Sequence, residues 1–226
     1  MSTRNLTTFY FAISIIFIAL ETIEVVWITI AAKALIIPLL MVLYYRLVRS
    51  QMNLFHRLIL AALLFSWIGD VTLQLNQFND IFFMVGLSGF LIAQLIYLSA
   101  FFSTRGSNIL FFRKFWLIFI VIAYGIGIVW LLFDGLGDMK IPVIAYTIVI
   151  LTMLSAAINR KEKVNRLSYK LVLIGAMFFI LSDSLIAIDK FTFEFPLARI
   201  AIMSTYVAAQ YLIAVGCLKQ FEIKLK

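Results

Sequence analysis

Charged residues are scarce in this chain, and their scarcity decides its class. Of its 226 residues, 13% are Asp, Glu, Lys or Arg, whereas 64% are hydrophobic and the mean hydropathy is +1.07. A soluble globular domain has about 25% charged residues and about 45–50% apolar ones. The composition therefore excludes an ordinary soluble domain. It predicts a polytopic membrane protein whose main partner is the lipid bilayer.

Cysteine and histidine are almost absent. The single cysteine, Cys217, excludes an internal disulfide and a CxxC metal or redox site. The single histidine, His56, has no second imidazole with which to build a metal site, and it stands beside Arg57, where we expect a surface position at the cytoplasmic interface. The sequence also lacks a phosphate-binding loop, a Ser/His/Asp arrangement and zinc-ligand spacing. We therefore predict no cofactor and no metal.

Apolar runs fill the chain, and a transmembrane helix needs about 20 such residues. The first run is too long for a secretory signal, so we interpret it as a span. Short loops favour a compact antiparallel all-α bundle. Glu21 and Glu24 lie where the first run ends. The eight predicted spans are Leu6–Ile23, Ala34–Val48, Leu58–Leu75, Ile81–Phe102, Phe111–Phe133, Ile141–Ile158, Leu171–Ile188 and Ala198–Leu218.

Basic residues gather on one side of this predicted bundle. If the N-terminus and every second loop share a side, that side carries fifteen Lys and Arg residues. The other side carries four, which are Lys33, Lys140, Lys190 and Arg199. Cytoplasmic loops hold the excess of Lys and Arg. We therefore predict that both termini are cytoplasmic. The net charge of +8 then reflects membrane orientation and indicates no nucleic-acid partner.

Two aspartates lie inside apolar runs. Asp70 belongs to the predicted span Leu58–Leu75, and Asp183 belongs to Leu171–Ile188. A carboxylate at the centre of a transmembrane helix costs about 2.5–3.5 kcal/mol on insertion scales. Such residues face the bundle interior or a water-filled cavity and mark functional sites. The two aspartates are therefore the first candidates for the functional site.

The surroundings of the two aspartates match. Asp70 and Asp183 are 113 residues apart, and so are Arg57 and Lys170, the basic residues that precede them. At a rise of about 1.5 Å per residue, each aspartate lies about 20 Å from its basic anchor. Both side chains should therefore lie at the same depth, in the outer half of the membrane.

This match predicts a tandem repeat of four helices, residues 1–107 and 108–226, within one transmembrane domain of residues 1–226. An even-numbered unit repeats with the same orientation, so the repeat axis runs along the membrane normal. Such an axis can bring Asp70 and Asp183 face to face around one cavity. Chance similarity between apolar sequences is the alternative interpretation.

Polar side chains accompany the aspartates. Ser66, Asp70, Gln74 and Gln77 recur at helical spacing, so we expect one inward-facing polar stripe. Hydrogen bonds that only hold the helices together, worth about 0.6 kcal/mol each, are the alternative role for such groups. The residues predicted to position substrate or water are Gln94, Tyr97, Tyr206, Gln210, Asp189, Asn76, Gln74 and Tyr146.

These segments resemble the YhhN-like lysoplasmalogenase family of integral membrane proteins. Two features depart from the family pattern. Gln94 stands where many members have a histidine, and Lys33-Ala-Leu, followed later by Pro38, replaces a Lys-Pro-Leu sequence. The resemblance rests on Phe65–Asp70 with Gly86–Tyr97, and on Phe179–Asp189 with Tyr206–Gln210.

The resemblance implies hydrolysis of the vinyl ether bond of lysoplasmalogens to a fatty aldehyde and glycerophosphocholine or glycerophosphoethanolamine. A vinyl ether has no carbonyl to attack, so hydrolysis begins with protonation of the β-carbon and passes through an oxocarbenium ion. This chemistry needs an acid and a nearby anion. Two neighbouring carboxyl groups that share one proton supply both. We therefore predict that Asp70 and Asp183 are the catalytic acid–base pair, in either order.

Two other functions fit the same pattern. Paired intramembrane carboxylates also couple protons to transport, so a proton-coupled transporter of lipids or small molecules is the alternative. A lipid-binding or lipid-sensing bundle without catalysis is the third hypothesis. As the favoured interpretation, we expect a multi-pass enzyme of the bacterial cytoplasmic (inner) membrane with a lysophospholipid substrate.

Overall fold

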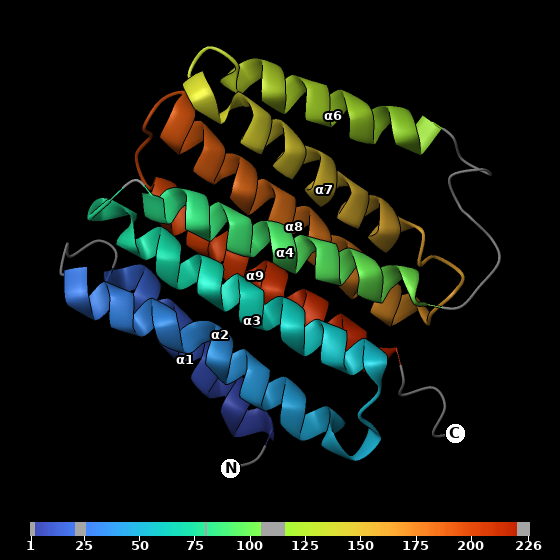
Figure 1. Cartoon of the computed structure of the whole chain (residues 1–226). Coiled ribbons are helices and arrows are strands. Elements are labelled where there is room, and N and C mark those ends of the chain that lie inside the picture. The colour runs from blue at the N-terminus through green and yellow to red at the C-terminus, as the bar shows by residue number, and fades with distance from the viewer. Residues whose placement is uncertain (1–2, 21–25, 80, 105–115, 221–226) are drawn as a thin grey trace. The chain divides into compact units, whose positions relative to one another are not determined.

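The computed structural model describes residues 3–20, 26–79, 81–104 and 116–220, and these ranges are almost entirely helical. The all-α prediction is confirmed for them (Figure 1). Short 3-10 turns follow α2 and α3 and precede α7, namely η1 (Arg49–Gln51), η2 (Leu75–Gln77) and η3 (Gly137–Met139). The α-helices are α1 (Thr3–Leu20), α2 (Val26–Val48), α3 (Leu54–Gln74), α4 (Ile81–Phe102), α6 (Trp116–Leu132), α7 (Lys140–Ile158), α8 (Arg166–Phe191) and α9 (Ala198–Lys219).

Each of these helices overlaps one of the predicted spans. Within the described ranges, six helical segments are long and apolar enough to cross a membrane, and two further apolar helices, Thr7–Ala19 and Trp116–Leu132, are shorter. The multi-pass membrane prediction is therefore confirmed. Glu21 and Glu24 lie outside the described residues. The six long segments are Lys33–Gln51, Leu54–Gln77, Ile81–Phe102, Gly137–Ile158, Arg166–Phe191 and Ala198–Lys219.

The chain forms two compact units, residues 1–97 and residues 98–226. In the first unit, α2 packs against α1 and against α3. In the second unit, α8 and α9 form the most extensive helix pair, and α7 packs against α8 and α6. Asp70 belongs to the first unit and Asp183 to the second, so each is described within its own unit.

Glycines let α3 and α4 approach closely. A Cβ atom added to Gly89 would lie 3.0 Å from the backbone nitrogen of Gly69, and one added to Gly69 would lie 2.8 Å from the ring of Phe90. Gly86 faces Leu73 in the same way, at 2.7 Å. Gly86 and Gly89 are therefore close-packing positions. They also fix the antiparallel register of the two helices next to Asp70.

The two glycines of α6, Gly125 and Gly127, differ in their surroundings. A Cβ atom on Gly125 would lie 2.5 Å from a methyl group of Leu151 on α7, so Gly125 is a close-packing position. A Cβ atom on Gly127 would meet no described atom within 4 Å, so Gly127 is not a close-packing position in the described structure. The two positions differ because residues two apart on a helix point in nearly opposite directions.

Asparagine caps begin the two helices that carry the aspartates. The side-chain oxygen of Asn53 accepts a hydrogen bond from the backbone N–H of His56 at 3.0 Å. The side-chain oxygen of Asn165 accepts one from the N–H of Ser168 at 2.8 Å. A cap of this kind stabilises a helix by about 1 kcal/mol. Helices α3 and α8 therefore begin in the same way, 17 and 18 residues before their aspartates.

His56 is buried, and the surface position predicted for it is wrong. Its side chain is 2% exposed, and its Nδ1 shares a hydrogen bond of 2.8 Å with the hydroxyl of Tyr44 on α2. The rings of Phe55 and Tyr44 both lie edge-on to the imidazole. The cap at Asn53 places His56 in the first turn of α3, where its imidazole faces α2. The histidine therefore joins two helices.

Candidate active site

A tyrosine from the preceding helix holds Asp183. The hydroxyl of Tyr146 on α7 donates a hydrogen bond to Oδ2 of Asp183 on α8. Tyr146 is 8% exposed, and Asp183 is half-buried. A hydrogen bond to a charged group contributes about 1.5–3 kcal/mol. The structure thus brings together two residues that the sequence analysis singled out, 37 positions apart in the chain.

A second tyrosine contacts the next residue of α8. The hydroxyls of Tyr124 on α6 and Ser184 share a hydrogen bond of 2.7 Å. Tyr124 is not among the site residues predicted from the sequence. It is the only residue with a hydroxyl in the apolar run Phe111–Phe133, and that isolation was the available signal. Two adjacent residues of α8, Asp183 and Ser184, therefore each bind a tyrosine hydroxyl.

On α9, the predicted pair Tyr206 and Gln210 lies against the turn of α8 that precedes Asp183. Nε2 of Gln210 donates to the hydroxyl of Tyr206 at 3.1 Å, and both residues are buried. The ring of Tyr206 lies edge-on to Phe179, with 5.7 Å between ring centres. Phe179 is one helical turn before Asp183. Asp189 lies six residues beyond Asp183, about 9 Å further along the helix.

In the first unit, Asp70 is 2% exposed and therefore buried. It directly follows Gly69, the residue at which α3 lies closest to Gly89 of α4. Ser66, one turn before Asp70, is fully buried. The carboxyl group of Asp70 thus belongs to a buried polar stripe beside the contact between α3 and α4.

Two side chains near this contact have unpartnered polar atoms. Gln94 on α4 is fully buried, and neither its amide nitrogen nor its amide oxygen has a hydrogen-bond partner among the described residues. The hydroxyl of Ser66 has no such partner either. Tyr97, one turn after Gln94, is also fully buried. Gln94, Ser66 and Tyr97 therefore all lie in the interior of this unit.

The polar stripe changes character beyond Asp70. Oε1 of Gln74 accepts a hydrogen bond of 3.4 Å from Nζ of Lys33 on α2. Oδ1 of Asn76 is buried without a partner in the described chain. Gln77 is exposed, and its amide bonds to the backbone carbonyl of Gln74. The inward position expected for Gln77 is therefore wrong, because the helix tightens into the turn η2 from Leu75.

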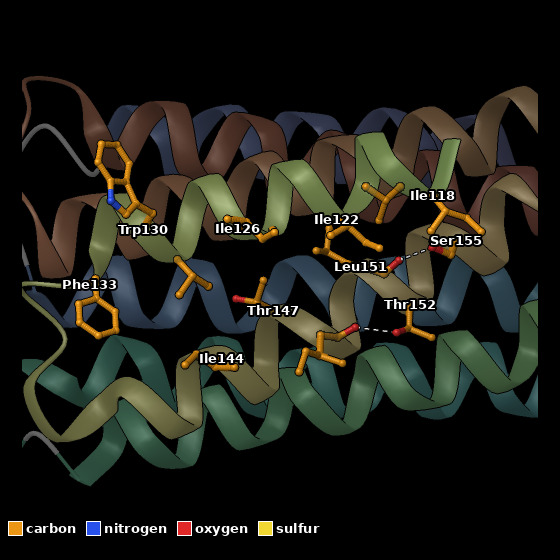
Figure 2. A pocket seen from close by; sticks show the side chains of 14 residues that line it. Ile118, Ile122, Ile126, Trp130, Phe133, Ile144, Thr147, Leu151, Thr152 and Ser155 are labelled. Carbon is orange, nitrogen blue, oxygen red and sulfur yellow. Dashed lines mark hydrogen bonds between the residues drawn. The ribbon is translucent and has the colours of Figure 1, made fainter. Parts of the chain in front are cut away.

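An apolar groove runs along the contact between α6 and α7, with a volume of about 590 Å³. Figure 2 shows its aliphatic and aromatic walls, from Ile118 to Phe133 on α6. The hydroxyls of Thr147, Thr152 and Ser155 each donate to a carbonyl of their own helix, four residues earlier. The groove therefore offers a hydrocarbon surface and no group that could act as an acid or a base.

Within the described ranges, no three His, Cys, Asp or Glu side chains lie close enough together to hold a metal ion. Inside the described spans, the polar side chains near the two aspartates present carboxyl, phenol, amide and hydroxyl groups, while the imidazole of His56 and the thiol of Cys217 are buried elsewhere. Such groups suit proton transfer and hydrogen bonding.

Comparison with known protein families gives one match over most of the chain. The model of the YhhN family matches residues 28–217, a range that includes Asp70 and Asp183. The chain belongs to the YhhN family. The family resemblance predicted from the motifs is therefore confirmed.

Several proteins that are similar in sequence to this YhhN-family chain are named lysoplasmalogenases. Lysoplasmalogenase TMEM86B of Homo sapiens is 30% identical over 190 residues, which cover 84% of this chain and 76% of that protein. Lysoplasmalogenase TMEM86B of Sus scrofa is 29% identical over 167 residues, 72% of this chain and 64% of that protein. Lysoplasmalogenase TMEM86A of Bos taurus is 54% identical over 48 residues, 21% of this chain and 20% of that protein. No solved structure matches this YhhN-family protein.

Proposed function

We propose that this YhhN-family protein hydrolyses the vinyl ether bond of lysoplasmalogens. The products are a fatty aldehyde and glycerophosphocholine or glycerophosphoethanolamine. The observation that carries the proposal is the similarity to a human lysoplasmalogenase over 84% of the chain. Carboxyl groups inside apolar helices support it, because the reaction requires proton transfer and stabilisation of a cation.

We assign the chemistry to Asp70 and Asp183. One carboxylic acid donates its proton to the β-carbon of the vinyl ether, which leaves an oxocarbenium ion. The other carboxylate stabilises this cation and accepts a proton from the water that adds to the α-carbon. The hemiacetal then collapses to the aldehyde and releases the glycerol oxygen as a hydroxyl. The division into one acid and one base resembles that of glycosidases.

Tyr146 suggests which aspartate plays which part. A hydroxyl that donates to a carboxylate oxygen stabilises the negative charge on it. Tyr146 donates to Asp183, and Asp70 is the more deeply buried carboxyl group, which makes its charged form costly, so we assign Asp183 to the anionic role and Asp70 to the acid. Tyr206, Gln210, Gln94 and Tyr97 then position lipid or water around these groups.

The decisive experiment uses the purified full-length protein in detergent, without an ion gradient. It is incubated with choline and ethanolamine lysoplasmalogens while fatty aldehyde is measured. We expect aldehyde release with at least one head group. Uptake of lysolipid or protons into proteoliposomes without aldehyde release would instead favour the transporter, since a transporter leaves its substrate intact. Binding of lysolipid with neither uptake nor aldehyde would favour a lipid sensor.

We further propose that all eight described α-helices cross the bilayer, with both termini in the cytoplasm of a bacterial cell. Helices α1 and α6 have 18 and 17 residues, about 26 Å at 1.5 Å per residue, against about 30 Å of hydrocarbon. A small local thinning of the bilayer accommodates such a difference. The unequal division of Lys and Arg between the two sides supports this orientation.

A further inference from the structure

The first unit holds three buried polar atoms near Asp70 that have no hydrogen-bond partner among the described residues. They are the amide oxygen and nitrogen of Gln94 and the hydroxyl oxygen of Ser66. Both side chains are fully buried. A buried polar group without a partner costs about 1–3 kcal/mol, so its persistence needs an explanation. A bound molecule that supplies the missing partners is such an explanation.

The register of α3 and α4 places these atoms at the same level. Phe90 of α4 packs on Gly69 of α3, and Gln94 follows Phe90 by four residues on the same helical face. Ser66 precedes Gly69 by three residues. Because the helices are antiparallel, both steps run in the same direction, by about 6 Å and 4.5 Å at 1.5 Å per residue. Gln94 and Ser66 therefore lie on facing sides, one turn from Asp70.

The chemistry of these groups selects the ligand. An amide offers two N–H donors and one carbonyl acceptor, and a serine hydroxyl offers one donor and two acceptor lone pairs. A neutral hydroxyl group, which both donates and accepts, satisfies the amide and the serine together. A phosphate would place negative charge within one turn of Asp70 in an apolar interior, which is costly. The pair therefore suits an uncharged hydroxyl.

We infer that Gln94 and Ser66 bind the free sn-2 hydroxyl of the lysolipid glycerol. This inference rests on the proposed function, because it takes the lysolipid as substrate. The carbon that bears this hydroxyl is bonded directly to the carbon that bears the vinyl ether oxygen. Holding it beside Asp70 brings the double bond within reach of the acid. A lipid acylated at this position lacks the hydroxyl, so the pair also selects lysolipids against diradyl lipids.

The test measures binding, so that it does not depend on turnover. The wild-type protein is titrated by calorimetry with a saturated 1-alkyl lysophospholipid, which has no vinyl ether to cleave, and with its 2-deoxy analogue. One hydrogen-bonded hydroxyl is worth about 1–3 kcal/mol, so we expect the wild type to bind the hydroxylated lipid about 10–100 times more tightly. Gln94→Met, which keeps the side-chain length and removes the amide, should bind both lipids equally. Ser66→Ala should reduce the preference in the same direction.

The control is Thr104→Val. The hydroxyl of Thr104 is also buried without a partner in the described structure, but Thr104 lies two residues beyond the end of α4 and ten residues beyond Gln94. This variant should keep the wild-type preference for the hydroxylated lipid. A wild-type protein that binds the two lipids equally would overturn the inference. So would a Gln94→Met variant that keeps the full preference, even if it loses turnover, because the pair would then hold water or serve packing.

The binding test and the aldehyde assay together separate this inference from the proposed function. If the protein prefers the hydroxylated lipid through Gln94 but releases no aldehyde from lysoplasmalogens, the hydroxyl site is supported and the proposed reaction is contradicted. If the protein releases aldehyde but binds the lipids with and without the sn-2 hydroxyl equally, the reaction is supported and the hydroxyl site is contradicted.

Discussion

The hydroxyl of Tyr146 donates a hydrogen bond to the carboxylate of Asp183, and this bond links α7 to α8 at the residue proposed to carry the anion. Tyr146→Phe should therefore lower kcat for aldehyde release by about 10–100-fold, the equivalent of about 1.5–3 kcal/mol for a hydrogen bond to a charged group. The matched control is Tyr124→Phe, which removes the hydroxyl that bonds the neighbouring Ser184. It should change kcat by less than about threefold, since that bond joins neutral groups. Equal effects of the two variants would contradict the role of Tyr146.

Replacement of either aspartate by asparagine keeps the shape of the side chain and removes its capacity to exchange a proton. Asp70→Asn and Asp183→Asn should each reduce aldehyde release by more than about 10²-fold, the lower end of what a general acid or base contributes. Both variants should elute from a sizing column in detergent as the wild type does. Full activity in either variant would end the assignment of an acid–base pair.

Gly135 lies in the connection after α6, where a side chain has no room. A Cβ atom added there would lie 1.6 Å from the backbone carbonyl oxygen of Phe191 at the end of α8. Backbone atoms must shift to relieve this overlap, so Gly135→Ala should lower the free energy of unfolding by about 1–3 kcal/mol. Gly127→Ala is the control, since its Cβ atom would meet nothing within 4 Å. It should stabilise α6 by about 0.5–1 kcal/mol. Thermal unfolding in detergent measures both, and equal melting temperatures would contradict the close contact.

The predicted orientation has a direct labelling test. In a Cys217→Ser background, Lys161→Cys reports on the connection between α7 and α8, and Asp138→Cys reports on the connection between α6 and α7. Because basic residues concentrate near Lys161, this position should be cytoplasmic. A membrane-impermeant maleimide added to intact spheroplasts should label Asp138→Cys and leave Lys161→Cys unlabelled until the cells are opened. The reverse pattern would invert the topology.

Sequence patterns located the helices well because apolar runs bounded by polar or charged residues mark them, and six of the described helical segments are long enough to cross a bilayer. The two aspartates were also visible, since a carboxyl group stands out in an apolar run. Their partners were harder to predict. The Tyr146–Asp183 bond joins positions 37 residues apart, and no local spacing encodes it. The polar stripe on α3 was extended too far because the periodicity assumed an α-helix through Gln77, whereas the chain tightens at Leu75.

His56 shows a second limit of sequence reasoning. Its neighbour Arg57 and its place near the start of a span favoured a surface position. Burial instead depends on the hydroxyl of Tyr44, which satisfies an imidazole nitrogen from the adjacent helix. Gln94 shows the reverse case. Its amide was selected from the sequence as a positioning group, but only the structure reveals that both of its polar atoms, and the hydroxyl of Ser66, have no partner in the part of the chain that is described.

The asparagine caps have a consequence for how the protein tolerates length changes. Each cap fixes where its helix starts. The number of residues between the cap and the aspartate therefore sets the position of the carboxyl group along the helix axis and its direction around that axis. One inserted residue between Asn165 and Asp183 would turn that group by about 100° and move it about 1.5 Å along the axis. This change of helical register would point the carboxyl group away from Tyr146. The number of residues between Asn165 and Asp183 is therefore a constraint that the cap places on this segment, separate from the packing of its individual side chains.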